Sequence, residues 1–513
     1  MDRPPERAAA TAPLALGEGS SASAGRPGWQ RGEMLALAAI TVLAAMLRLY
    51  RLGDWSFWVD EAHTYRDLLA ARDVFWSSDV SSYPLSFVLL RWLVDLGMPT
   101  AEGWLRLPFA FFGIISVPAL GLVGRGLVGP RASLLAALLL AFSPWHIYWS
   151  QSARSYAMVL FFALLAVAVF FRGMRRRSPL LLLLSLSLTA VAGLCHPSAY
   201  ILLAGYVGYG LTLLRWPGRG DRATGGGLHK WMPLISIALL ATLVIVLMPL
   251  LEHVRKDKPD FSLFHLLQTL AFFVRIPVIV AALGGLLWLF DRGSPSASLL
   301  LAWIAVPVLA LAVLALLMKM TAQYAFYTLP GFCLLAATVV LALANRVTAA
   351  GFRGHLLRAV PLGILLLDMA GQSYLYFERN YGERPRWREV RTYLQHRPGA
   401  VKRVLTTNQP SLSYYLNPMD FTGRSFAGSF EVVGLAKYKL QGSPTAFFEE
   451  HIASSRKSGV ELYVAISEPE LDEMEPRGVA DAFLREHFLQ VRRLPNWNGP
   501  KDMTVLIYWL PTE

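Results

Sequence analysis

Long apolar runs, separated by short basic segments, dominate the first three quarters of this 513-residue chain. The runs are about 20 residues long, which is the length that a helix needs to cross a bilayer core of about 30 Å. Charged residues make up only 16% of the chain, compared with roughly 25% in soluble domains. The sequence therefore predicts a polytopic α-helical membrane protein.

The placement of charge predicts the topology. The net charge of +13 does not indicate nucleic-acid binding, because the basic residues lie between apolar runs, where the positive-inside bias puts them. A consistent assignment has about eleven spans and a cytoplasmic N-terminus. It requires that "YPLSFVLLRWLVDLG" (83–97) lie on the external membrane surface rather than cross. The basic cluster "RGMRRR" (172–177) then stays inside.

Composition divides the chain into three parts. Residues 1–33 are rich in Ala, Pro, Gly, Ser and Arg, so we expect a disordered cytoplasmic segment. Residues 34–375 form the transmembrane domain, with a first external loop at about 53–105. Residues 376–513 alternate helical patterns with short apolar strands, which predicts an external α/β domain. Glycine-rich nucleotide motifs are absent from this last part, and the only two cysteines, Cys195 and Cys333, sit far apart in apolar runs.

A carboxylate pair interrupts an aromatic stretch just after the first apolar run. Asp60 and Glu61 lie in "RLGDWSFWVDEAHTYRDLL" (51–69), among four aromatic residues. Burial beside these rings is expected to raise carboxylate pKa values. One interpretation is an interfacial loop with solvated acids and an aromatic belt. The other is an active site, where an ionised Asp takes a proton from an incoming hydroxyl.

Further polar side chains occur at the external ends of other expected spans. They are Arg106, His146, Gln151, Arg154, His196, Gln323 and Tyr324. Each has a simpler explanation, such as an Arg reaching the headgroups or a Tyr in the aromatic belt. Their common depth beside the acid pair favours a binding site for an anionic phosphate.

Five segments, in order, carry a resemblance to a known family. They are "FWVDEAHTY", "YPLSFVLLRWLVDLG", "RLPFAFFGIISVPALGLVGRGLVGP", "SPWHIYWSQSARSYAM" and "QYAFYTLPGF". Together they resemble the GT-C membrane glycosyltransferases of family 39, the protein mannosyltransferase and aminoarabinose transferase type. The resemblance covers about residues 34–375. It implies a sugar donor on a polyprenyl phosphate and Asp60 as the catalytic base. We expect Glu61 to orient Asp60 or the acceptor, or to share a divalent ion.

The chain departs from the family pattern at several positions. Tyr83-Pro84 stands where members often have Pro-Pro, and Gln323-Tyr324 where they often have Arg-Tyr. Some members hold the donor phosphate with a lysine near the prolines, whereas this neighbourhood offers Arg91. These differences concern the phosphate ligands and the sugar specificity rather than the fold.

The expected reaction is inverting transfer of a sugar to an acceptor hydroxyl on the external face. Arg106 and Arg154 are the candidates for stabilising the departing phosphate, and Tyr156, in "SQSARSY", is a further candidate ligand. Asp60 and Glu61 would share a divalent cation (Mg²⁺ or Mn²⁺) if the enzyme uses one. The acceptor is a lipid, a glycan or a protein side chain. A composition rich in Ala, Leu, Arg and Gly suggests a bacterial inner-membrane protein with a periplasmic C-terminal domain.

Two other classes of protein have many spans. A transporter or lipid flippase usually places ionisable residues near the bilayer midplane, on broken helices. In this chain the acids cluster at one surface instead. A catalytically inactive scaffold could keep the same fold and bind a partner through its external domain.

Overall fold

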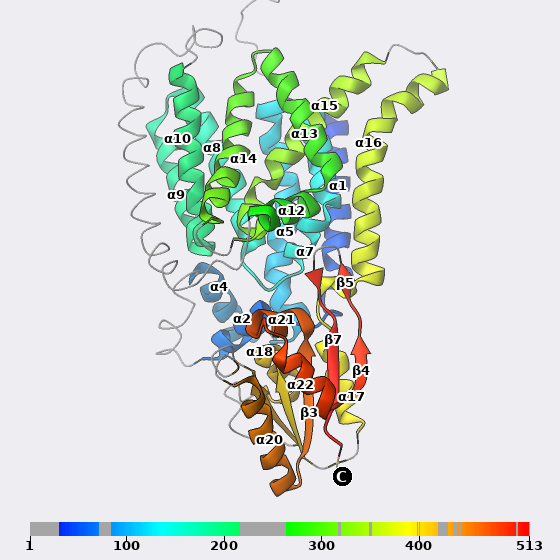
Figure 1. The fold of residues 1–513 in the computed structure, drawn as a ribbon. Coiled ribbons are helices and arrows are strands. Elements are labelled where there is room, and N and C mark those ends of the chain that lie inside the picture. The colour runs from blue at the N-terminus through cyan, green and yellow to red at the C-terminus, as the bar shows by residue number, and fades with distance from the viewer. Residues whose placement is uncertain are drawn as a thin grey trace, which may run out of the picture.

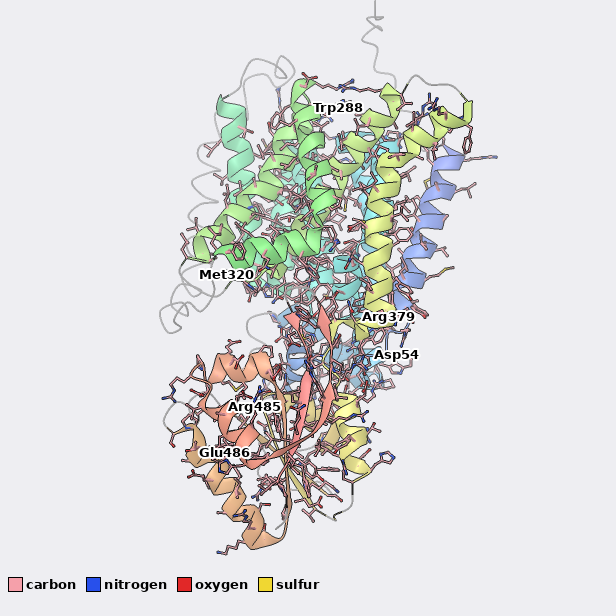
Figure 2. All side chains as sticks on the ribbon, turned by 45° about the vertical axis from the view of Figure 1, so that its right-hand side comes forward. Asp54, Trp288, Met320, Arg379, Arg485 and Glu486 are labelled. Carbon is pink, nitrogen blue, oxygen red and sulfur yellow. The ribbon has the colours of Figure 1, made fainter. Side chains whose placement is uncertain are left out.

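The computed structural model describes residues 30–70, 84–215, 263–316, 320–347, 351–397, 399, 401–418, 429–435, 440, 443–498 and 501–511. A bundle of helices forms one half of the molecule, and a unit built on a β-sheet lies at one end of that bundle (Figure 1). Asp54 and Arg379 lie at the junction of the two halves, whereas Arg485 and Glu486 lie out on the sheet-containing unit (Figure 2).

The helical half contains elements of very different length. They are α1 (Arg31–Leu49), α2 (Val59–Leu69), α4 (Pro84–Asp95), α5 (Glu102–Val128), α6 (Pro130–Phe142), α7 (Pro144–Ser150), α8 (Tyr156–Arg176), α9 (Pro179–Cys195), η2 (Pro197–Tyr200), α10 (Ile201–Arg215), α12 (Leu263–Val274), α13 (Ile276–Asp291), α14 (Pro295–Leu314), η5 (Ala322–Thr328), α15 (Leu329–Arg346), α16 (Gly351–Tyr374) and the π-helical segment η6 (Leu375–Arg379).

Within the described residues, six helices are long and apolar enough to cross a membrane, or up to eight if each bent pair counts as one span. This confirms a polytopic helical membrane protein. The expected count of about eleven spans remains a prediction, because residues 216–262, which include another apolar run, lie outside the described residues. Helix α9 is apolar but shorter than the six.

Two sharp bends shape the end of the bundle that faces the sheet unit. Helices α6 and α7 meet at 62°, and α12 and α13 meet at 88°. At the first bend, Ser143 caps α7 by accepting a hydrogen bond from the backbone N–H of His146, and Pro144 follows at the first helical position. Helix α7 is buried from Trp145 to Ser150, so the bend brings its polar residues inside the protein.

Helix α4 is the segment predicted to lie on the membrane surface. It has 12 residues, which corresponds to about 18 Å and is too short to cross the bilayer core. It lies between the helical half and the sheet unit (Figure 1). Both observations agree with the prediction that this segment does not span.

The C-terminal unit is the predicted α/β domain. Its strands are β1 (Lys402–Thr406), β2 (Phe430–Gly434), β3 (Glu461–Ser467), β4 (Leu489–Leu494) and β7 (Val505–Trp509), in the order β2-β1-β3-β7-β4. The first three pair in parallel, while β7 is antiparallel to β3 and β4. A second, two-stranded ladder joins β5 (Trp497–Asn498) to β6 (Lys501–Asp502).

Helices cover this sheet and complete its cores. They are α17 (Trp387–Gln395), α18 (Gln409–Leu416), α20 (Pro444–Ser458), α21 (Glu468–Met474) and α22 (Val479–His487). Separate apolar clusters contain alternate residues of β3: Val464 belongs to one cluster, and Tyr463 and Ala465 to the other. Since successive strand residues point to opposite faces, the sheet is buried on both sides at its central strand β3, whereas the edge strand β4 is mostly exposed.

Candidate active site

The acid pair lies in the first turn of α2, where carboxylates interact favourably with the helix dipole. Successive helix residues point about 100° apart, so the two side chains enter different surroundings. Glu61 is fully buried, whereas the Asp60 side chain is 29% exposed. The pair therefore consists of one interior carboxylate and one accessible carboxylate.

The carboxylate of Glu61 is saturated with hydrogen bonds. Its Oε1 accepts from Arg106 Nε at 2.8 Å and from the Ala153 backbone N–H at 2.8 Å. Its Oε2 accepts from Arg106 Nη2 at 2.8 Å and from Arg384 Nε at 3.4 Å. A carboxylate has about four acceptor positions, so all are used.

This network sets the protonation state of Glu61. Burial raises the pKa, but the charges of Arg106 and Arg384 and the hydrogen bonds outweigh it, so the pKa of Glu61 is lowered. The prediction that the aromatic surroundings raise carboxylate pKa values was wrong for Glu61. No local pattern in the sequence indicates that two arginines reach the same side chain.

Arg106 lies inside the protein rather than at an open phosphate site. Its Nη1 donates to the carbonyl oxygens of Leu52 and Trp55, at 3.1 and 3.0 Å, and its Nη2 also donates to Ser56 O at 3.1 Å. Together with the bonds to Glu61, these contacts use all five guanidinium N–H groups. Because Arg106 is also 0% exposed, the geometry does not fit its predicted role at the donor phosphate.

Arg384 is a residue of this site that sequence reasoning missed. Its Nη1 donates to Gly382 O at 3.2 Å, Nη2 donates to Ser152 Oγ, and its guanidinium lies 3.9 Å from the Tyr148 ring centroid. Its carbonyl oxygen accepts from Asn496 Nδ2 at 2.7 Å. The chain segment between the last span and the C-terminal unit therefore contributes directly to the surroundings of the acid pair.

The backbone before Arg384 adopts an uncommon conformation. Tyr381, Gly382 and Glu383 have φ angles of +48°, +58° and +53°. A Cβ at Gly382 would lie 2.5 Å from the Trp55 ring, so the close approach requires glycine. Non-glycine residues at positive φ are uncommon, and such strain often marks functional positions. Here it directs Arg384 toward Glu61.

Asp60 faces a different arginine. Arg154 Nε lies 3.8 Å from Asp60 Oδ2, and the two side chains are 11% and 29% exposed. Arg154 Nη1 also donates to Thr64 Oγ1 at 3.4 Å, and that hydroxyl donates to the Asp60 carbonyl at 3.0 Å. The pairing of Asp60 with Arg154 brings together two residues that the sequence proposed separately.

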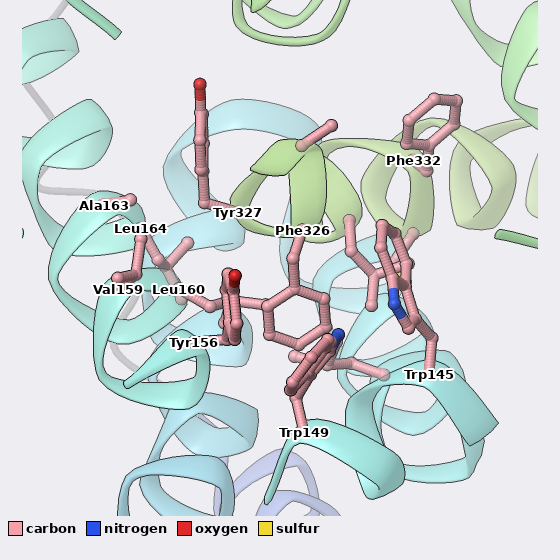
Figure 3. Close-up of a cluster of buried hydrophobic side chains, with 14 of the residues drawn as sticks. Trp145, Trp149, Tyr156, Val159, Leu160, Ala163, Leu164, Phe326, Tyr327 and Phe332 are labelled. Carbon is pink, nitrogen blue, oxygen red and sulfur yellow. The ribbon is translucent and has the colours of Figure 1, made fainter. Parts of the chain in front are cut away.

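An aromatic wall continues from Arg154 toward η5. Tyr156 OH lies 3.5 Å from His196 Nε2, and the His196 ring stacks on Tyr324 with centroids 5.4 Å apart. On its other side, Tyr156 packs against Trp149 at 4.2 Å, and Trp149 lies beside Phe326 (Figure 3). The structure thus groups three predicted residues, Tyr156, His196 and Tyr324, from three separate elements.

His146 and Gln151 face inward and join helices. His146 Nδ1 lies 2.7 Å from Arg48 Nη2. Gln151 Nε2 donates to the carbonyls of Arg48 and Tyr50, at 3.1 and 2.7 Å, and its Oε1 accepts from Tyr376 OH at 2.9 Å. Both His146 and Gln151 are 0% exposed. They tie together the ends of α1, α7 and η6 and do not border the Asp60–Arg154 pair.

The remaining candidates lie elsewhere. Arg91 Nη1 donates to the carbonyls of Leu68 and Ala70, at 2.9 and 3.3 Å, so it caps the C-terminal end of α2. Gln323 is half-buried in η5. Tyr83 lies outside the described residues.

A cleft of about 400 Å³ lies beside the contact between α2 and the C-terminal unit, where the rings of Tyr65 and Tyr414 pack with centroids 4.7 Å apart. These two tyrosines line the cleft together with Arg388. At its edge, Glu102 accepts hydrogen bonds from Arg388 Nη2 at 2.7 Å and from Tyr415 OH at 2.9 Å. These bonds join the first residue of α5 to the C-terminal unit.

The donor atoms around the acid pair decide where the predicted divalent cation could bind. In the described part of the chain, no group of three or more His, Cys, Asp or Glu side chains is placed to share an ion. Glu61 could bind a cation only by giving up contacts with Arg106 or Arg384. Asp60 is the member of the pair whose carboxylate is open to a ligand.

Comparison with known proteins identifies the fold. No family model and no curated protein sequence matches the chain. Among solved structures, it is similar to apo ArnT from Cupriavidus metallidurans, with a TM-score of 0.51 and 12% identity over 93% of this chain and 98% of that one. The same protein bound to undecaprenyl phosphate gives a TM-score of 0.51 at 13% identity, with the same coverage.

An oligosaccharyltransferase from Archaeoglobus fulgidus, tethered to an acceptor peptide, gives a TM-score of 0.53 at 13% identity, over 90% of this chain and 72% of that one. These proteins share the GT-C fold of membrane glycosyltransferases. The likeness confirms the fold predicted from the sequence resemblance.

Proposed function

We propose that this protein transfers a sugar, with inversion, from a polyprenyl-phosphate-linked monosaccharide to an acceptor hydroxyl. The reaction takes place at the membrane face that carries the C-terminal unit, which we take to be the periplasmic face of a bacterial inner membrane. The similar ArnT structure contains undecaprenyl phosphate, which supports a lipid-linked donor. The observation that carries the proposal is the accessible Asp60 carboxylate paired with Arg154 at 3.8 Å.

Asp60 acts as the general base. The acceptor hydroxyl donates a hydrogen bond to the Asp60 carboxylate and gives up its proton as its oxygen attacks the anomeric carbon. The new oxygen–carbon bond forms opposite the phosphate, and the bond from the anomeric carbon to the phosphate oxygen breaks. The electron pair of that bond remains on the polyprenyl phosphate, whose negative charge increases by one.

Arg154 stabilises this developing charge. The Arg154 guanidinium lies beside Asp60. The preceding residue, Ala153, donates its backbone N–H to Glu61, so the backbone before Arg154 is held in place. A positioned donor aimed at developing charge is worth about 3–4 kcal/mol. Tyr156 and His196, in contact with each other at 3.5 Å, extend the polar lining of the proposed donor subsite.

Glu61 positions the base rather than reacting. Its four hydrogen bonds fix the first turn of α2 to α5, to the loop before α8 and to Arg384. Asp60 is the preceding residue, so its backbone is held by the same contacts. A divalent cation, Mg²⁺ or Mn²⁺, would bind through Asp60; comparing transfer in EDTA with transfer after the ion is restored tests this part of the proposal.

The function is tested on the full chain in nanodiscs, supplied with polyprenyl-phosphate sugars and candidate hydroxyl acceptors. We expect release of free polyprenyl phosphate together with a glycosylated product. The Asp60→Asn variant should lose this activity, whereas Asp54→Asn, which alters a 53% exposed acid of the same loop, should keep it. Movement of an intact donor across a bilayer without cleavage would instead identify a flippase, and donor binding without either process would identify a scaffold.

A further inference from the structure

A short hairpin projects from the C-terminal unit toward the membrane helices. Strands β5 and β6 form it, and its base is closed by hydrogen bonds from Met503 N to Asn496 O at 2.8 Å and from Asn496 N to Thr504 Oγ1 at 3.2 Å. Figure 1 shows β5 beside the lower end of α16, while the C-terminus lies at the opposite end of the sheet. We propose that this hairpin inserts Trp497 into the lipid headgroup region and so anchors the C-terminal unit on the bilayer.

The base of the hairpin is fixed close to the point where the chain leaves the membrane. Buried Asn496 donates to the carbonyl oxygen of Arg384 at 2.7 Å. Arg384 lies five positions after the end of the last candidate span, Gly351–Arg379. Trp497, the residue after Asn496, is therefore held near the membrane boundary by the fold itself.

Trp497 is 76% exposed. Single exposed apolar residues are common on soluble surfaces, so exposure alone does not identify a partner. The location of Trp497 at the membrane boundary points to lipid as the partner, because Trp is enriched at membrane interfaces, where its ring contacts lipid and its N–H stays hydrated.

Other exposed aromatic residues lie at the ends of the helices that are nearest the C-terminal unit. Tyr50 follows α1 and is 51% exposed, Trp104 lies in the first turn of α5 and is 49% exposed, and Tyr374 ends α16 and is 56% exposed. The Tyr50 hydroxyl donates to Glu378 in η6 at 3.1 Å, which shows that the ends of α1 and α16 meet. These residues form an aromatic belt at the helix ends nearest the C-terminal unit, and the hairpin adds Trp497 to it.

The charge of the neighbouring strand suits a bilayer surface. Arg492 and Arg493 on the edge strand β4 are both exposed and precede the hairpin. Basic residues near a bilayer are attracted to anionic headgroups. The proposed occupant is therefore an anionic lipid surface, and the proposal does not depend on the catalytic assignment.

The experiment measures the depth of a spin label on the full chain in nanodiscs of phosphatidylethanolamine and phosphatidylglycerol. The label is attached to Trp497→Cys; the two native cysteines are buried and remain unlabelled. Leu489→Cys is the matched control. Leu489 is also an exposed apolar residue, at 54%, but lies at the far end of β4, paired with Trp509.

We expect the label at 497 to collide more often with oxygen than with a water-soluble nickel complex, corresponding to a depth of about 5–10 Å. The label at 489 should show the reverse preference. Equal access of the nickel complex to both positions would overturn the proposal. Protection of position 497 from both reagents would overturn it too, because protein rather than lipid would then cover the hairpin.

Discussion

The buried network around Glu61 and the accessible pair of Asp60 and Arg154 begin on the same turn of α2, yet they differ in burial and in hydrogen bonding. In the network, Glu61, Arg106 and Arg384 are 0% exposed, and Glu61 and Arg106 use all their hydrogen-bonding positions. In the accessible pair, the closest atoms are 3.8 Å apart and both side chains retain exposure. A saturated carboxylate stabilises the fold, whereas an unsaturated one can accept a substrate proton.

The largest predicted effect on stability comes from breaking the network. Glu61→Gln leaves two buried guanidinium groups without their counter-charge, and breaking a buried pair costs about 3–5 kcal/mol. Glu378→Gln is the control, since Glu378 pairs with Arg51 at the surface and exposed pairs contribute about 0–1 kcal/mol. Thermal unfolding of the purified variants in detergent measures both; equal melting temperatures would show that the network does not stabilise the fold.

The next effect belongs to the accessible pair. Arg154→Ala should lower kcat/KM for the donor about 100-fold, consistent with roughly 3 kcal/mol from one positioned donor, while the melting temperature stays near that of the wild type. Arg91→Ala should instead lower the melting temperature and leave kcat/KM for the donor unchanged, because Arg91 contacts the C-terminal carbonyls of α2. If Arg91→Ala impairs donor use and Arg154→Ala does not, the two assignments are reversed.

A smaller effect is expected at the turn that directs Arg384. Gly382→Ala puts a side chain at a positive φ of +58° and places its Cβ 2.5 Å from the Trp55 ring. We expect the free energy of unfolding to fall by about 2–3 kcal/mol, because of backbone strain and overpacking. Gly459→Ala is the matched control: its φ is +66° but no atom lies within 4 Å, so only about 1 kcal/mol of strain applies. Denaturant unfolding in detergent compares the two, and equal losses would mean that the contact with Trp55 is unimportant.

Acid provides a graded way to weaken the network. The pKa of Glu61 in the folded protein is lower than its ordinary value, so its contribution to stability is present above the unfolded-state pKa of about 4.3. That contribution is lost as the pH falls through the folded-state pKa. The melting temperature of the wild type should therefore fall more steeply below about pH 4 than that of Glu61→Gln; parallel curves would contradict the linkage.

Sequence reasoning could predict the helical membrane half because apolar length is a local signal. It also placed Arg154, His196 and Tyr324 at one depth. The structure pairs Arg154 with Asp60 of α2 and groups His196 and Tyr324 with Tyr156. Depth follows from position along a span, so residues at equivalent span ends can be grouped without knowledge of the tertiary packing.

The interior of the site could not be predicted in this way. Arg384 is separated from Glu61 by 323 positions, and only the folded chain shows that they meet. Depth also does not say which way a side chain points, which is why Arg106, His146 and Gln151 were expected at the open site but lie fully buried. Arg106 and Gln151 donate to five backbone carbonyl oxygens, which no pattern of side chains reveals.

The central claim is that Asp60 acts as the base whereas Glu61 stabilises the fold. Its most direct test is single-turnover sugar transfer by Asp60→Asn, with the melting temperature measured on the same sample. The substitution keeps the shape of the side chain but removes the base, so we predict a rate at least about 100-fold below that of the wild type, with unchanged stability. Transfer at the wild-type rate would contradict the account, because the accessible carboxylate would then have no part in the chemistry.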